Sequence, residues 1–175
     1  MTDADRLIIE TPDQVPETFA EVYAYWTAKR GGDWAPTLRD FHLDELPSEI
    51  LPWSVVVDVR TDPLDFHYRF WGTGRVRLIG AEMTGKLASE IADGYMRDAN
   101  MREYRDLIEI RRPLLCQTPV TTASGNTATF QSLRLPFRGD DGGGDVAHVY
   151  SAINHADMSE EHYDYYGTRP AGSGP

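Results

Sequence analysis

Cysteine, lysine and long apolar runs are nearly missing from this sequence of 175 residues. Cys116 is the only cysteine, so the chain forms no intramolecular disulfide and no cysteine-rich zinc site. No apolar run approaches the ~18 residues that a membrane span requires. The first residues, MTDADRLIIETPDQ, lack the basic and apolar regions of a secretory signal peptide. We therefore expect a cytoplasmic protein.

Positive charge is also scarce. The formal net charge is −11, and Lys29 and Lys86 are the only lysines. A surface this acidic repels phosphate backbones and anionic lipids, so we expect neither a nucleic acid nor a membrane as partner. The length suits one domain with a sizeable core and is short for two.

The clearest positive signal is a strand pair in the middle of the chain. Residues 53–73 read WSVVVDVRTDPLDFHYRFWGT, in which β-branched and aromatic residues alternate with others about an Asp-Pro turn, as in a β-hairpin. Pairing about this turn puts Val57 opposite Tyr68 and Val56 opposite Arg69. One face is then apolar and carries Val55, Val57, Val59, Phe66, Tyr68 and Phe70. The other face is mixed and carries Val56, Asp58, His67, Arg69 and Trp71.

Helices and three more strands are predicted around this hairpin. Residues 16–30 show a helical apolar stripe that ends at Gly31-Gly32 and must cover the chain's own sheet or a second subunit; it consists of Phe19, Val22, Tyr23 and Trp26. Short helical pieces follow the hairpin, and a long helix over 95–112 ends before Pro113. Strands are predicted over 114–121, 127–138 and 146–154.

This order of elements predicts an α+β fold with a five-stranded antiparallel sheet, helices on one face and an added N-terminal helix. We divide the chain into four parts. They are a flexible N-terminus (1–15), the N-terminal helix with a wrapping segment (16–52), the core (53–155) and a flexible C-terminal tail (156–175).

The motifs for nucleotide, metal and catalytic chemistry are weak. Gly72, Gly74 and Gly80 lack the spacing of a dinucleotide fingerprint, and we interpret them as structural glycines that allow positive φ where the chain leaves the second strand. The histidines lack a zinc-protease spacing, and the Asp-Gly loop at 139–145 lacks the EF-hand pattern. We predict no metal site and no catalytic residues.

Asp58, His67 and Arg69 on the mixed face are the nearest approach to an acid–base cluster. An ion pair on a half-solvated sheet face is the favoured interpretation, because general-base catalysis also needs a pocket. The alternative is a small cone-shaped α+β enzyme that uses Asp58 and His67.

A ligand site is predicted from the register of the last two hairpins. It places Leu133, Leu135, His148 and Tyr150 on one side of the sheet, with Gln131 nearby. If that side continues from the face of Tyr68, a cavity forms that is lined by Tyr68, Tyr104, Gln131, His148 and Tyr150. The same residues describe a filled core equally well. A register error of one residue would move every one of them to the opposite face.

Five segments resemble the PAS (Per-Arnt-Sim) domain, and more narrowly a group of small stand-alone PAS proteins from alphaproteobacteria. They are VYAYWTAKRGG from Val22, LPSEILPWSVVVDV from Leu46, FHYRFWGT from Phe66, TGK from Thr84 and LRLPF from Leu133. The resemblance covers roughly residues 20–155.

The resemblance implies a sheet ordered 2-1-5-4-3, a helical flank that encloses a ligand cavity, and signalling without catalysis. The cofactor stays unknown: Cys116 lies in a strand and not in the flavin-binding cysteine motif, and the long helix lacks a haem-binding histidine. We expect a sensor or regulator that binds a small molecule or a protein partner and acts on a separate signalling protein. The resemblance also implies a homodimer through the helix that carries Phe19, Val22, Tyr23 and Trp26. An interaction module with a filled core is the alternative.

Overall fold

A six-stranded antiparallel sheet forms the centre of the computed structural model, which describes residues 6–122, 125 and 127–157. The sheet order is β1-β4-β5-β6-β2-β3. When β1 is set aside, this is the predicted order 2-1-5-4-3. The strands are β1 (Arg6–Ile8), β2 (Ser54–Thr61), β3 (Leu64–Trp71), β4 (Leu114–Thr121), β5 (Thr127–Arg138) and β6 (Val146–Ile153).

The N-terminal segment corrects one expectation. Residues 1–15 were predicted to be loose, but Arg6–Ile8 forms the edge strand β1, with Ile8 opposite Leu114 of β4. The next residue, Ile9, donates its N–H to the carbonyl of Pro113 at 2.9 Å and is buried. Strand pairing at the β4 edge and the burial of Ile8 and Ile9 order this part of the chain, whereas Leu7 stays exposed.

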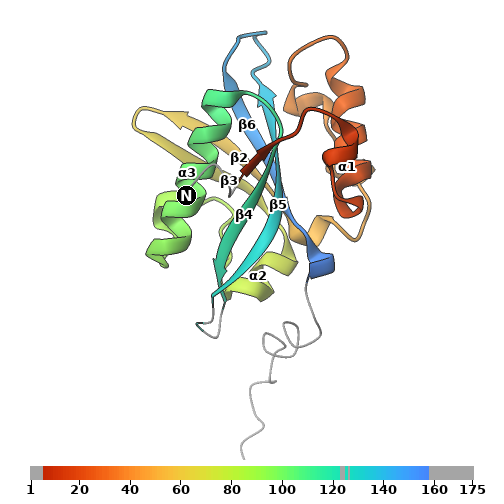
Figure 1. Cartoon of the computed structure of the whole chain (residues 1–175). Helices are drawn as coiled ribbons and strands as arrows, with labels where there is room; N and C mark the ends of the chain where they lie inside the picture. Colours follow the sequence, from red (N-terminus) through yellow and green to blue (C-terminus); the bar gives the residue numbers. More distant parts are fainter. Residues whose placement is uncertain (1–5, 123–124, 126, 158–175) are drawn as a thin grey trace, which may run out of the picture.

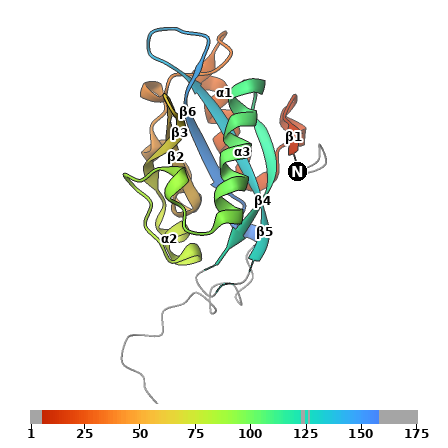
Figure 2. The same cartoon turned by 90° about the vertical axis from the view of Figure 1, so that its left-hand side faces the viewer.

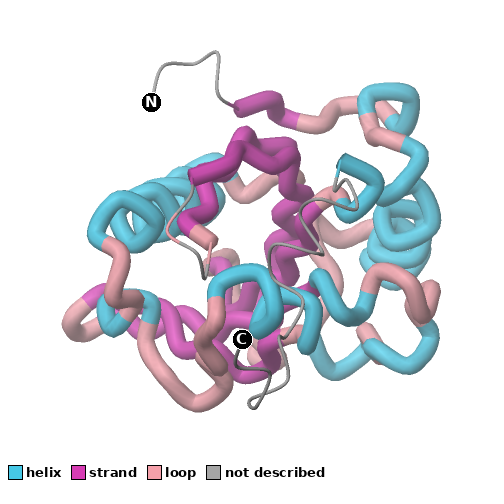
Figure 3. The backbone as a smooth tube through the Cα atoms, turned by 90° about the horizontal axis from the view of Figure 1, so that it is seen from below, coloured by secondary structure: helices cyan, strands magenta, loops and turns pink. Residues whose placement is uncertain are grey.

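Helices cover both faces of the sheet, as Figures 1 and 3 show. The helix α1 (Glu17–Arg30) lies on one face and ends at Gly31, whose φ is 56°. The helix α3 (Gly94–Ile110) lies on the other face, with α2 (Thr73–Ile79) below it (Figure 2). The Asp93 side chain accepts a hydrogen bond from Met96 N at 2.7 Å and so begins α3.

The apolar stripe of α1 covers the chain's own sheet, which is one of the two predicted possibilities. Phe19, Val22 and Trp26 are at most 1% exposed and lie in one core cluster with Leu133 and Leu135 of β5. We call this the α1 side of the sheet. A second cluster lies on the opposite face, under α2 and α3, and we call that face the α3 side.

A β-bulge changes the predicted hairpin. Val57 pairs with Tyr68, as predicted, but Val56 pairs with Phe70 and not with Arg69, because the register shifts between Val56 and Val57. One extra residue on a strand exchanges the faces beyond it. Phe70 therefore lies on the α1 side and Trp71 is buried on the α3 side, the reverse of the prediction.

The glycines after β3 are structural, but partly for another reason than the predicted one. Gly72 has φ −66°, which any residue adopts. A Cβ at Gly72 or Gly74 would instead collide with the backbone oxygen of Pro52. Of Gly72, Gly74 and Gly80, only Gly80, which ends α2 with φ 72°, has the left-handed conformation.

A long connection links α1 to β2. Residues 32–50 wrap the α1 side through 3-10 turns such as Leu38–Asp40, and the turn Leu51–Trp53 then brings Trp53 into the α3-side cluster. The predicted tail 156–175 falls largely outside the described residues, which end with a 3-10 turn at His155–Asp157. Within the described residues, no helix combines the length and apolar character of a membrane span.

Candidate functional site

The predicted ligand-binding residues are divided between the two faces of the sheet. Tyr68 and Tyr104 lie in the α3-side cluster, whereas Tyr150 lies in the α1-side cluster. Val57 pairs with both Tyr68 and Val149, so Val149 shares the face of Tyr68 and the next residue, Tyr150, points the other way. The premise that these two sides are continuous is wrong.

The predicted ligand-binding residues on the α1 side make contacts that are typical of a protein core and its rim. Tyr150 Oη lies 2.7 Å from Ser54 Oγ, which donates to the carbonyl of Ile50 at 2.8 Å. His148 Nδ1 lies 2.8 Å from Asp58 Oδ1. Gln131 is half-buried, and the alternation along β5 puts it on the face of Leu133. This part of the predicted site is therefore separated by the sheet from Tyr68 and Tyr104.

The α3 side holds a fully buried ion pair that sequence reasoning missed. Arg134 of β5 and Glu103 of α3 form a salt bridge, and their side chains are 1% and 0% exposed. Arg134 Nε donates to Glu103 Oε2 at 2.6 Å, and Arg134 Nη2 donates to Asn100 Oδ1 at 3.1 Å. Thr118 of β4 also donates to Glu103 Oε2, at 2.9 Å. The pair therefore connects α3 with β4 and β5 at the centre of the sheet.

Arg134 keeps its positive charge despite its burial. Burial by itself lowers the pKa of Arg134, but the adjacent Glu103 carboxylate outweighs it and the pKa is raised. The guanidinium carbon also lies 4.4 Å from the centroid of the Tyr104 ring, a cation–π contact. Burial raises the pKa of the neighbouring Cys116 thiol to about 12, so this group stays protonated and unreactive near neutral pH.

Four buried polar atoms on the α3 side have no hydrogen-bond partner. They are Tyr68 Oη, Trp71 Nε1, Arg75 Nη2 and Glu103 Oε1. Burial, reinforced by Tyr104, raises the pKa of Tyr68 well above its ordinary value, so its hydroxyl stays protonated. Buried polar groups in proteins are nearly always paired, so such a concentration needs an explanation. We call this region, between the sheet, α2 and α3, the α3-side compartment.

The predicted ion-pair cluster forms on the other side of the sheet. Asp58 accepts from Arg69 Nε at 2.9 Å and lies 3.5 Å from His67 Nδ1, and His148 joins them from β6. Burial alone raises the pKa of Asp58, but the hydrogen bonds from Arg69 and His148 dominate and the pKa is lowered. The favoured interpretation, an ion pair on a half-solvated sheet face, describes this geometry.

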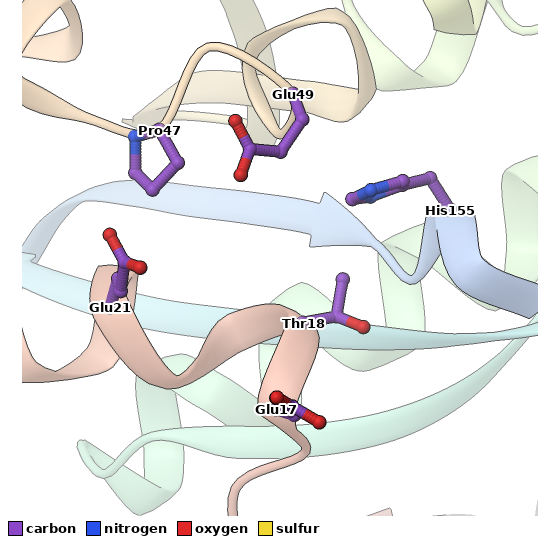
Figure 4. Close-up of a pocket in the computed structure, with 6 residues that line it drawn as sticks. All are labelled: Glu17, Thr18, Glu21, Pro47, Glu49 and His155. Carbon is purple, nitrogen blue, oxygen red and sulfur yellow. The ribbon is translucent and has the colours of Figure 1, made fainter.

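A surface groove of about 310 Å³ lies between the start of α1 and the end of β6 (Figure 4). It is acidic and is lined by Glu17, Thr18, Glu21, Pro47, Glu49 and His155. The His155 ring stacks on Trp53 with a centroid distance of 6.5 Å. No three histidine, cysteine or carboxylate side chains of the described residues are grouped to hold a metal ion, in this groove or elsewhere.

The sequence model of the PAS domain matches residues 15–148, and the chain belongs to this family. No curated protein matches the sequence. Among solved structures, an RNA-binding light-oxygen-voltage receptor is similar with 14% identity and a TM-score of 0.44, covering 85% of this chain and 37% of that one. A fungal LOV domain photoreceptor is similar with 16% identity and a TM-score of 0.43, covering 65% of this chain and 79% of that one.

Membership of the PAS family indicates the general role that domains of this fold have. PAS domains are typically sensor modules in signalling and are generally non-catalytic. The cone-shaped enzyme fold, on which the catalytic alternative for Asp58 and His67 depended, is not the fold of this chain.

Proposed function

We propose that the protein is a non-catalytic PAS sensor that binds a small ligand in the α3-side compartment and acts on a separate signalling protein. The observation that carries the proposal is the set of four unpartnered polar atoms inside an otherwise apolar cluster. Ligand sites are mostly apolar with a few polar groups that fix orientation, and this compartment has that composition.

The buried ion pair offers a route from the ligand to the rest of the fold. Asn100 and Glu103 of α3 hold Arg134 of β5, so a displacement of α3 changes hydrogen bonds in the middle of the sheet. A ligand shifts such an equilibrium only by as much as it binds one arrangement better than the other. Contacts between a ligand and both α3 and β3 would provide this difference.

Native mass spectrometry of the full chain, purified from its own host, tests the proposal. We expect a bound small molecule that is released on denaturation, or a metabolite that raises Tm in a thermal-shift screen. A clean apo mass together with no stabilising metabolite would contradict the ligand-binding function.

A specific surface feature favours homodimer formation as a second candidate function. Phe19, Val22 and Trp26 of the predicted interface are buried in the chain's own core, and only Tyr23 remains partly exposed. The outward surface of α1, however, carries a largely apolar groove of about 370 Å³ that is lined by Pro12, Val15, Ala20, Tyr23, Ala24, Thr27 and Ala28.

A second copy of the chain is the occupant that we propose for this groove. Ala20, Ala24 and Ala28 recur every four residues and allow close helix–helix approach. Glu17 and Glu21 lie in the first half of α1, and Lys29 and Arg30 end it. An antiparallel pair of α1 helices would therefore place opposite charges near one another.

Sedimentation of an Ala24→Arg variant tests the dimer, with Ser48→Arg, at an exposed position away from the groove, as the control. We expect dissociation only in the Ala24 variant, because its arginine occupies the groove. A monomeric wild-type chain, or equal behaviour of the two variants, would contradict this interface.

A further inference from the structure

Three buried hydrogen-bond donors of β3 and α2 share one neighbourhood and lack an acceptor. They are Tyr68 Oη, Trp71 Nε1 and Arg75 Nη2, from residues that are 0%, 6% and 6% exposed. The Tyr68 and Trp71 ring centroids are 4.7 Å apart, and Arg75 Cζ lies 5.7 Å from the Trp71 ring.

The chemistry of these atoms indicates what they lack. An indole N–H and a guanidinium N–H can only donate, and the neutral Tyr68 hydroxyl can also donate. A buried donor without a partner loses its hydration and gains nothing in return. All three groups would be satisfied by one occupant with closely spaced acceptor oxygens.

The charge balance of the α3-side compartment points to an anion. Arg134 is neutralised by Glu103, but Arg75 Nε donates to the neutral carbonyl of Trp53 at 2.8 Å. None of the ion pairs found among the described residues includes Arg75. Burial lowers the pKa of Arg75 to about 10, which reflects the cost of this unneutralised charge. The compartment thus holds one net positive charge.

The surroundings of the three donors select the rest of the occupant. Tyr68 and Trp71 belong to the α3-side cluster, which also contains Phe66, Leu78, Met96, Tyr104 and Leu107. Such walls suit an aliphatic or aromatic body and not a strongly hydrated dianion such as phosphate. Tyr68 is 0% exposed and Trp71 and Arg75 are each 6% exposed, so a molecule bound to their donor atoms would be enclosed.

We propose that the α3-side compartment binds a small monocarboxylate with an apolar body, whose oxygens accept hydrogen bonds from Tyr68, Trp71 and Arg75. Arg75 supplies the compensating charge, and the two aromatic donors set the orientation of the carboxylate. This inference rests on the proposed ligand-binding function and names its ligand class.

Calorimetry and thermal shift on the full chain test the inference. The probes are sodium hexanoate, sodium benzoate and sodium phenylacetate, with benzamide as a neutral analogue and sodium chloride at equal ionic strength. We expect at least one carboxylate to bind and raise Tm, while benzamide and chloride do not. Native mass spectrometry identifies any acid that the purified protein retains.

Paired tryptophan variants assign the binding to these donors. Trp71→Phe removes the indole donor of the compartment, and Trp26→Phe makes the same change on the α1 side, where Nε1 already donates to Pro136 O. We expect Trp71→Phe to weaken carboxylate binding about tenfold, or about 1.4 kcal/mol. Trp26→Phe should bind like the wild type, and circular dichroism confirms that both variants fold.

Each contrary result has a distinct meaning. Equal stabilisation by benzoate and benzamide, or equal binding by the two tryptophan variants, would overturn the inference. A retained neutral molecule would overturn the carboxylate class and leave the sensor function standing. A clean apo mass without any binding acid or metabolite would remove both.

Discussion

The two faces of the sheet bury the same kinds of polar aromatic side chain in opposite ways. On the α1 side, Trp26 Nε1 donates to Pro136 O at 2.9 Å and Tyr150 Oη bonds to Ser54 Oγ. On the α3 side, Trp71 Nε1 and Tyr68 Oη have no partner. The first face is built as a closed core, whereas the second leaves hydrogen-bonding capacity unused.

The two faces of the sheet also differ in the charges that they bury. The α3 side places a complete ion pair, Arg134 with Glu103, between helix and sheet, together with the unneutralised Arg75. The ion pairs on the α1 side, such as Asp58 with Arg69, lie where water reaches them. A sheet that needed only stability could have used apolar side chains on both faces, since buried ion pairs are often no better than apolar residues. The buried polar groups of the α3 side are the basis of the ligand-binding function that we propose.

The largest expected effect comes from breaking the buried ion pair. Glu103→Leu leaves the Arg134 guanidinium buried without a counter-charge, and we expect the free energy of unfolding to fall by ~3–5 kcal/mol. Urea unfolding measures it. The double variant Glu103→Leu/Arg134→Met should lose less than the sum of the two single changes, because it removes both charges.

An exposed ion pair provides the control for that experiment. Asp33→Asn removes the negative charge that pairs with Arg138 Nη2. The Asp33 side chain is 59% exposed, so we expect a much smaller loss. Equal losses for Glu103→Leu and Asp33→Asn would show that burial does not distinguish the two pairs.

A smaller effect separates the two tryptophans. In ligand-free protein, Trp26→Phe and Trp71→Phe remove the same atoms from buried positions, but only Trp26 loses a hydrogen bond. We expect Trp26→Phe to lower the free energy of unfolding by ~1 kcal/mol more than Trp71→Phe does. The reverse order in chemical denaturation would contradict the contrast between the two faces.

The two tyrosines allow a finer comparison, because Tyr→Phe removes only a hydroxyl group. Tyr150→Phe should cost ~1 kcal/mol, the usual net value of a hydrogen bond. Tyr68→Phe removes an unpartnered buried hydroxyl, so we expect an unchanged or raised Tm in ligand-free protein. A clear loss of Tm in Tyr68→Phe would mean that the Tyr68 hydroxyl has a partner after all.

The smallest effect concerns the half-solvated cluster and its pH dependence. The pKa of Asp58 is lowered in the folded state, so its stabilisation is present above the unfolded pKa of about 4 and is lost as the pH falls below it. We expect Asp58→Asn to be less stable than the wild type at pH 7 by up to ~1 kcal/mol. The difference should shrink toward pH 3 in urea unfolding. A constant difference between these two pH values would exclude this ionisation as its source.

Much of the fold could be predicted because its periodicities are strong. The alternation in residues 53–73 and the helical stripe from Phe19 to Trp26 both reflect burial of one side of an element. The exchange of Phe70 and Trp71 could not be predicted, because a bulge adds one residue without changing the alternation pattern that surrounds it. β1 was missed because three residues are too few to show a period.

The candidate site was less predictable, and for a different reason. Arg134 stands between Leu133 and Leu135, a pattern that normally places the charged residue in solvent. Here α1 covers the leucines and α3 covers the arginine, so both faces are buried. Glu103 likewise resembles one more charge on a polar helix. Only the tertiary arrangement shows that these two residues meet. A charged residue inside a strand that is covered on both faces is the signal that could have found them.

The short strand β1 also has a consequence for the solubility of the protein. Its three residues pair with the outer edge of β4 at Leu114, Leu115 and Cys116. A bare edge of this type is a template on which other chains add strands and aggregate. Proteolytic trimming that removes Arg6–Ile8 would leave the sheet intact but would open a row of backbone donors and acceptors beside Leu115. These three residues therefore hinder the addition of a strand from another molecule at this part of the β4 edge.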